Sequence, residues 1–206
     1  TFNGRSNDST AIDARTGEVA GAIPLGGKPE FSVADGTGRI YVNVENTSEV
    51  VVLDAQKLRV VRRSSLAPCE EPTGLAMDLK QRRLFSVCGN KLMAVTDADS
   101  GKVLATVPIG AGTDGAGFDP GTGLAFSSNG GDGTLTLVRE VKGKYEAVET
   151  VPTGRGSRTM TVDLKLHRVY LPAAEFETAP AQPEPGRRGG RTLAVPDSFH
   201  LLVVGR

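Results

Sequence analysis

The chain has 206 residues, with 24 basic and 24 acidic side chains, 26 Gly and no Trp. A formal net charge of zero gives no support to a protein that binds nucleic acid or an anionic membrane through bulk charge. No stretch approaches the roughly 18 apolar residues of a membrane-spanning helix.

The first predicted elements in chain order are two short strands, at residues 10–13 and 18–24. A pattern then recurs about every 43 residues, in copies at 29–44, 72–88, 113–129 and 157–173. Each copy has a segment of small residues that ends in Asp, a short turn, and a strand with an aromatic residue. The aspartates are Asp35, Asp78, Asp119 and Asp163, and the aromatic residues are Tyr41, Phe85, Phe126 and Tyr170.

Each repeat divides into four predicted strands. The first ends in the Asp, and the second holds the aromatic residue. The third is rich in β-branched residues, at 49–54, 92–97, 134–138 and 200–204, and the fourth alternates apolar and polar residues, as at 102–107. No helical period is sustained, and a repeat of ~40–45 residues is typical of one propeller blade. We therefore predict an all-β chain, a β-propeller of four-stranded blades with about four to five blades present.

Some motifs are more specific than the repeat: Tyr41-Val-Asn-Val44, residues 69–78, Phe118-Asp-Pro120 and residues 158–163. In these motifs the chain resembles the YVTN-repeat β-propellers, specifically the YncE-like family of bacterial proteins. The resemblance implies seven blades in a full-length member, so we expect 1–206 to be a single propeller domain that lacks N-terminal blades. It also implies export to the periplasm or cell surface and a binding or scaffold role, with no agreed catalytic residues.

The repeated side chains are expected to be structural. The four aspartates each precede a short turn, where Asp accepts backbone N–H bonds. Because they lie on different blades they do not converge on one ion. The four aromatic residues are expected in the blade core rather than on a stacking platform.

Positions where the copies differ are better candidates for function. The start of each innermost strand opens onto the central funnel of a propeller, and there the copies carry charges of both signs. This funnel mouth comprises Lys28, Glu30, Glu70, Glu71, Thr73, Asp114, Arg155 and Arg158. Such a set can bind a polar ligand, with the arginines holding a carboxylate or phosphate. The alternative is a solvated rim of unrelated charges.

Cys69 and Cys88 are the only cysteines, and both fall at the same end of one blade. The export that the resemblance implies would allow a disulfide. Pairing of Asp78 with Arg83 across the turn places Cys88 nearer to Thr73 than to Cys69, so two buried thiols remain the alternative.

Residues 174–198, within the last blade, form a segment rich in Pro, Gly and Arg. This composition predicts a long surface loop without packed structure.

The preferred function is a non-catalytic, monomeric binding or interaction module that takes a small polar ligand or a protein partner at the funnel mouth. No cofactor or metal is expected, since His167 and His200 are too few and too far apart for a metal site. One alternative is a lactonase-like hydrolase that uses Glu71 and Asp114. A second is a nucleic-acid-binding propeller, against which the zero net charge argues.

Overall fold

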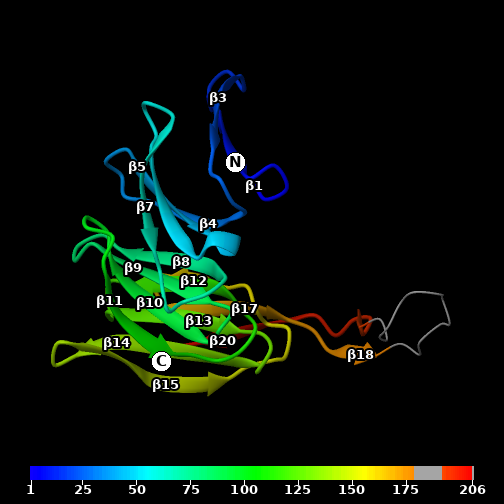
Figure 1. The fold of residues 1–206 in the computed structure, drawn as a ribbon. Helices are drawn as coiled ribbons and strands as arrows, with labels where there is room; N and C mark the ends of the chain where they lie inside the picture. Colours follow the sequence, from blue (N-terminus) through cyan, green and yellow to red (C-terminus); the bar gives the residue numbers. More distant parts are fainter. Residues whose placement is uncertain (179–191, 206) are drawn as a thin grey trace.

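The computed structural model describes residues 1–178 and 192–205. Within them the chain folds into five antiparallel sheets in succession and one two-stranded ribbon (Figure 1). We call the sheets the first to fifth blade. The first blade comprises β1 (Phe2–Asn3), β2 (Asp8–Ile12) and β3 (Val19–Pro24). The second comprises β4 (Pro29–Ala34), β5 (Arg39–Val44), β6 (Glu49–Asp54) and β7 (Arg59–Ser65).

The third and fourth blades also have four strands each. The third comprises β8 (Pro72–Asp78), β9 (Arg83–Cys88), β10 (Leu92–Asp97) and β11 (Val103–Pro108). The fourth comprises β12 (Thr113–Asp119), β13 (Leu124–Asn129), β14 (Thr134–Val141) and β15 (Lys144–Pro152). The fifth comprises β16 (Thr161–Asp163), β17 (Arg168–Ala173) and β20 (His200–Val204). The only helical segment in the described residues is one 3₁₀ turn, Glu45–Thr47, so the all-β prediction is confirmed.

The blades share one internal geometry. Strands of each blade follow one another in chain order, and β4, β8, β12 and β16 lie side by side as the innermost strands. In each of the first four blades, the pairing of the two outer strands contains one register shift, for example between Val95 and Thr96. Such bulges increase strand twist, which lets successive blades fan around an axis.

The hydrophobic core lies between blades rather than within one sheet. Four buried clusters each join two neighbouring blades: the cluster around Tyr41 and Leu84 joins the second and third, and the one around Phe85 and Val138 joins the third and fourth. Since both faces of a central blade are covered, the interior strands are buried on both sides, as β6 shows with Val50 to Leu53. Tyr41, Phe85 and Phe126 are buried, and Tyr170 is half-buried.

The innermost strands approach one another closely. A Cβ on Gly74 of β8 would stand 2.5 Å from the Asp114 carbonyl oxygen of β12, so only glycine fits there. Asn43 of β5 ties the second blade to the third, since its amide donates to the Thr73 and Gly74 carbonyls at 3.1 and 3.0 Å. These contacts hold the starts of successive inner strands together.

The repeated aspartates have the turn role expected of them. Asp35, Asp78, Asp119 and Asp163 each accept backbone N–H bonds from residues two to four positions later, as Asp78 does from Lys80 at 2.8 Å. The turns between the inner strand and the aromatic strand are therefore built alike in four blades.

Two expectations about the ends of the chain need correction. Phe2–Asn3 adds a third strand to the first blade, where the sequence predicted two, because β1 pairs with β2 through Phe2 and Ser9. The segment 174–198 also contains packed structure: β18 (Phe176–Thr178) pairs with β19 (Thr192–Ala194) in a ribbon that projects from the fifth blade (Figure 1). β-branched and aromatic residues at its two ends override the bulk composition. Residues 179–191 of that predicted loop lie outside the described residues.

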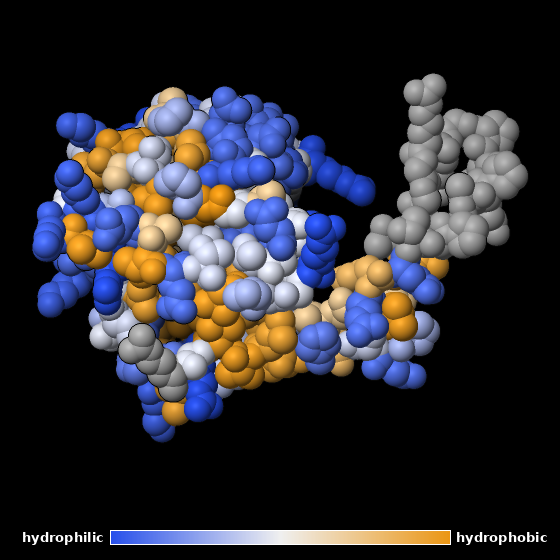
Figure 2. All heavy atoms as spheres, turned by 90° about the horizontal axis from the view of Figure 1, so that it is seen from below, coloured by the Kyte–Doolittle hydropathy of each residue, from blue (hydrophilic) through white to orange (hydrophobic). Residues whose placement is uncertain are grey.

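The fifth blade has three strands in the described residues. β20 pairs only with β17 in the described chain, and its exposed side chains include Leu201 and Val203. Figure 2 shows apolar surface gathered near the base of the projecting ribbon. The sheets of the described residues do not close into a ring.

Candidate functional site

Residues from four successive blades surround one cavity of about 280 Å³ at the start of the inner strands. Six of the eight predicted funnel-mouth residues line it: Lys28, Glu30, Glu71, Thr73, Asp114 and Arg158. Glu45, Gly89, Gly112 and Thr113 complete the lining. We call this space the funnel-mouth cavity.

Glu70 and Arg155 do not line the funnel-mouth cavity. Both are exposed, as Glu71 and Arg158 of the lining also are, and each is close in sequence to a lining residue. The Glu70 carbonyl accepts the Gly89 N–H at 2.9 Å, so this residue has a backbone role in the adjoining loop. The chain bends at Glu71, whose φ is 51°, and of the two neighbouring side chains only that of Glu71 lines the cavity.

Lys28 is held between two carboxylates of its own blade. Its Nζ lies 2.7 Å from Glu30 Oε1 and also contacts Glu45 Oε2. The hydrogen bonds that Lys28 donates to Glu30 and then to Glu45 raise its pKa above the ordinary value, so the ammonium stays charged. Two negative charges around one positive charge leave this side of the cavity acidic.

Arg158 pairs across a blade boundary. Its Nε lies 3.1 Å from Asp114 Oδ2, and its backbone carbonyl accepts the Gly115 N–H at 2.8 Å. Ser128 Oγ donates to the same carbonyl. The side chain of Arg158 remains 66% exposed, whereas that of Asp114 is 17% exposed. The Arg158 guanidinium is therefore already paired with a carboxylate. Arg155 does not line the cavity, so it adds no second guanidinium there.

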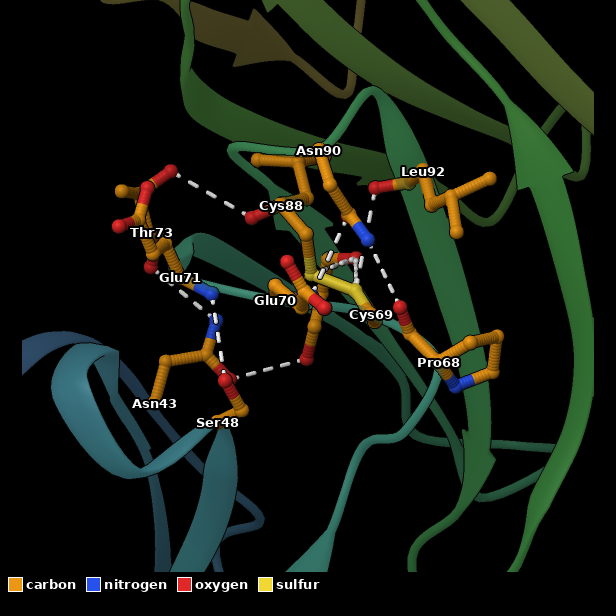
Figure 3. The surroundings of a disulfide bond; sticks show 12 residues. Asn43, Ser48, Pro68, Cys69, Glu70, Glu71, Thr73, Cys88, Asn90 and Leu92 are labelled. Atoms are coloured by element: carbon orange, nitrogen blue, oxygen red, sulfur yellow. Dashed lines mark hydrogen bonds between the residues drawn. A yellow bond between two sulfur atoms is a disulfide. The ribbon is translucent and has the colours of Figure 1, made fainter.

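Glu71 differs from the other carboxylates of the cavity. It makes no ion pair with any residue in the described chain. Its backbone is left-handed, with φ of 51°, which costs an ordinary side chain roughly 1–2 kcal/mol. Its N–H donates to Ser48 Oγ at 3.3 Å and its carbonyl accepts the Gly89 N–H at 3.1 Å (Figure 3). The fold thus holds an unpaired carboxylate in a strained position.

Gly89 gives the Glu71 side chain its room. A Cβ on Gly89 would stand 2.8 Å from Glu71 Oε2, which shows that the carboxylate lies directly over this glycine. Any larger residue at position 89 would displace the carboxylate. The half-buried Thr73 hydroxyl lies beyond it, 3.4 Å from the Thr113 carbonyl of the next blade.

A disulfide closes the loop that carries Glu71. Of the two alternatives left open by the sequence, the structure has the Cys69–Cys88 bond, with Cα atoms 5.8 Å apart. Cys88 does pair with Pro72 in the sheet, and a register shift between Pro72 and Leu75 accompanies the return of Cys69 towards it. Asn90 supports the loop by donating to the Pro68 carbonyl at 2.7 Å and accepting from the Glu70 N–H at 3.2 Å (Figure 3).

Two lining residues of the cavity, Glu45 and Gly89, were missed by sequence reasoning. Glu45 and Gly89 follow the aromatic strands β5 and β9. Because these strands run antiparallel to the inner strands, their ends meet the inner-strand starts at one rim. The turn after each aromatic strand was therefore a usable signal.

Metal-binding side chains are not grouped at this site. Among the described residues, no three His, Cys, Asp or Glu side chains are arranged to hold a metal ion.

In the described part of the chain, no helix has the length and apolar character needed to cross a bilayer.

Solved structures with similar folds were found, although the sequence similarity is low. The hydrazine synthase of Kuenenia stuttgartiensis has a TM-score of 0.64 and 12% identity, over 85% of this chain and 49% of that chain. The WD40 β-propeller domain of Doa1 has a TM-score of 0.61 and 14% identity, over 79% of this chain and 53% of that one.

The fold is a β-propeller. The fold-class prediction is confirmed, with the open arrangement of a partial propeller. This chain spans about half the length of each of the two structures. No family model and no curated protein matches the sequence. Membership of the YncE-like family therefore stays a prediction.

Proposed function

We propose that this protein is a non-catalytic YVTN/YncE-like β-propeller binding module that takes a polar ligand or partner loop in the funnel-mouth cavity. The observation that carries the proposal is that residues of four blades, distant in sequence, line one concave site. Their types differ from blade to blade, whereas the core and turn positions repeat. Binding sites on repeat scaffolds are built in this way.

The charge of the cavity favours a ligand with a cationic group. Four carboxylates line it, against Lys28 and Arg158. Both cations already have carboxylate partners, and Glu71 has none in the described chain. An anionic ligand would have to displace a partner from Lys28 or Arg158, whereas an ammonium group can pair with Glu71 directly.

The strain at Glu71 supports the same site. A non-glycine residue in the left-handed region persists only where its surroundings hold it, and such residues cluster at functional sites. The disulfide and the Gly89 contact supply that support here. Preorganisation of this kind lowers the entropy that a ligand loses on binding.

A titration with two probes of equal length tests the proposal. We expect 1,4-diaminobutane to shift the backbone NMR signals of Gly89, Gly112 and Thr113, and succinate to leave them unchanged. Glu71→Gln is expected to weaken diamine binding several-fold, because it removes the unpaired charge. Glu70→Gln is the matched control, since it removes a neighbouring charge outside the cavity. Shifts with succinate alone, or equal effects of the two variants, would overturn the proposal.

We also propose that the protein works outside the reducing cytosol, in the periplasm or as a secreted protein. Structural disulfides persist in oxidising compartments, and Cys69–Cys88 supports such a location. Both sulfurs are buried, so thiol alkylation of the protein unfolded without reductant directly after cell lysis tests this. Two alkylated cysteines would place the protein in a reducing compartment.

A further inference from the structure

At two blade boundaries a basic side chain of one blade meets the turn carboxylate of the preceding blade. In each case the side chain comes from the turn that follows the inner strand, at the boundary between the second and third blades and at that between the fourth and fifth. Arg82, four positions after Asp78, reaches back to Asp35 of the preceding blade, with both Nη atoms 3.3 Å from Asp35 Oδ2. His167, four positions after Asp163, reaches back to Asp119, with Nδ1 2.8 Å from Asp119 Oδ2. In both cases the preceding blade's turn carboxylate receives a cationic or imidazole group.

The boundary between the third and fourth blades lacks this contact. Gly123 stands four positions after Asp119, where Arg82 and His167 stand in their turns. All three residues have left-handed backbones, with φ of 69°, 55° and 53° for Gly123, Arg82 and His167. The turn is therefore the same, and only the side chain is missing.

The carboxylate that such a side chain would reach is Asp78. This residue is 7% exposed, and its Oδ1 accepts the N–H groups of Lys80 and Gln81 at 2.8 and 3.0 Å. Its Oδ2 has no hydrogen-bond partner within residues 1–178 and 192–205. In Asp35 and Asp119 the corresponding oxygen is the one that meets Arg82 or His167. Asp78 Oδ2 is therefore reached by solvent rather than by a side chain of the next blade.

A cavity of about 270 Å³ lies where the side chain of an Arg or His at position 123 would extend. Asp78 and Gly123 both line it, together with Phe85, Phe118 and Tyr145. The Phe85 and Phe118 ring centroids are 5.3 Å apart, and the Tyr145 ring meets Phe85 edge-on at 6.0 Å. The space is several times the ~30 Å³ of one water molecule in the liquid.

The remaining charges around this cavity are mixed. Arg139 and Glu140 of β14 and Lys142 of the following turn also line it, and all three are exposed. Neither cation makes an ion pair with Asp78 in the described chain. Burial, and then the Glu140 carboxylate, raise the pKa of Tyr145, as expected for a partly desolvated site.

We propose that this interblade cavity binds a guanidinium group from outside the chain, in the place that Arg82 occupies one boundary earlier. Asp78 Oδ2 accepts its N–H bonds, and the rings of Phe118 and Tyr145 flank the planar cation. The group belongs either to a free small molecule or to an arginine side chain of a peptide. This site is separate from the funnel-mouth cavity, with which it shares no lining residue.

Calorimetric and NMR titrations with three probes test the proposal. Methylguanidinium represents a free cation, the tripeptide Gly-Arg-Gly represents a side chain, and Gly-citrulline-Gly is a neutral isostere. We expect shifts at Gly123 and Tyr145 with the first two, and at least tenfold weaker binding of the citrulline peptide. A peptide that binds tenfold more tightly than methylguanidinium assigns the site to an arginine side chain, and equal affinities assign it to a small cation. Absence of shifts with both cations overturns the proposal.

Variants locate the binding. Asp78→Asn keeps the turn acceptor and is expected to weaken guanidinium binding at least tenfold. Gly123→Arg is expected to abolish it by filling the cavity, because a Cβ on Gly123 meets no atom within 4 Å. The left-handed backbone there is strained with a side chain, as it already is at Arg82 and His167. Asp163→Asn changes the equivalent turn in the fifth blade, outside the cavity, and is expected to bind as the parent does. Unchanged binding by Gly123→Arg would overturn the assignment even if Asp78→Asn failed to fold.

Discussion

The Ser86 hydroxyl of the third blade donates a hydrogen bond of 2.9 Å to the side-chain oxygen of Asn43 in the second blade. Both side chains are fully buried. The Asn43 amide meanwhile donates to the carbonyls of Thr73 and Gly74. One polar side chain therefore joins two strands of the neighbouring blade, beside the strand that leads into the funnel mouth.

Replacement of this asparagine is expected to destabilise the protein strongly. Asn43→Ala leaves the Ser86 hydroxyl and two carbonyls without partners, so we expect a loss of about 2–4 kcal/mol in the free energy of unfolding. Ser86→Ala removes one donor and should cost about 1 kcal/mol. Urea denaturation of both variants and of the double variant measures the coupling. Additive effects of the two changes would show that the buried contact contributes nothing.

Acid is expected to weaken the boundary between the fourth and fifth blades. Burial by itself raises the pKa of Asp119, but hydrogen bonds from the Thr122 hydroxyl and the Gly121 N–H, and then His167, outweigh it and lower the pKa below the ordinary value. A carboxylate with a lowered pKa in the folded state stabilises the fold above about pH 3.9, its unfolded pKa. That stabilisation is lost as the pH falls through the folded value.

Unfolding free energies at pH 5 and pH 2.5 measure this effect. Asp119→Asn is expected to lose less stability between the two pH values than the parent chain, because it has no carboxylate to protonate at this position. Asp35, Asp54 and Asp97 also have lowered pKa values, so the parent should not become independent of pH. Equal losses in the variant and the parent would contradict the role of Asp119.

Reduction of the disulfide is expected to lower stability by about 3 kcal/mol. The bond joins residues 19 positions apart, and a closed loop of this length restricts the unfolded chain by roughly that amount. Guanidinium denaturation with and without dithiothreitol measures the difference. Cys69→Ala/Cys88→Ala should match the reduced protein and show no response to dithiothreitol. Because Glu71 lies in this loop, the double variant should also bind 1,4-diaminobutane more weakly.

Addition of one methyl group between inner strands is expected to be costly. In Gly74→Ala the new Cβ would contact backbone atoms of β12 at 2.5 to 2.8 Å, and backbone gives way less readily than a side chain. We expect a loss of at least 2 kcal/mol, within the usual range for overpacking. Gly4→Ala is the matched control, since its Cβ would stand 3.6 Å from the Lys28 side chain. Similar melting temperatures for both variants would contradict the close approach.

Much of the fold could be predicted from the repeat. The spacing of Asp35, Asp78, Asp119 and Asp163 indicated equivalent turns, and each makes them. Local hydrogen bonds and strand periodicity depend on residues close together in sequence, so the pattern records them directly. β1 and the β18–β19 ribbon were missed because short strands depend on their partners more than on their own composition.

The candidate site could be predicted only in part. Lys28, Glu71, Asp114 and Arg158 were found because they differ between copies at equivalent positions. Glu45 was missed because it follows the second strand of an antiparallel hairpin, whose end lies beside the start of the first strand. Arg155 was included because sequence distance cannot tell which side chain faces inward. The sequence also could not predict that Lys28 and Arg158 each pair with a carboxylate.

The sequence by itself determined the repeat, the all-β class, the turn chemistry and the rim that differs between blades, because these depend on short-range periodicity. Only the tertiary structure decided which charges pair, that Cys69 reaches Cys88, and that Gly123 leaves Asp78 without the Arg or His contact that Asp35 and Asp119 have. Those relations join residues of different strands, and their distances follow from blade twist and register. The physical reason is that a blade buries its faces against its neighbours, so its specific contacts exist only once the blades are packed.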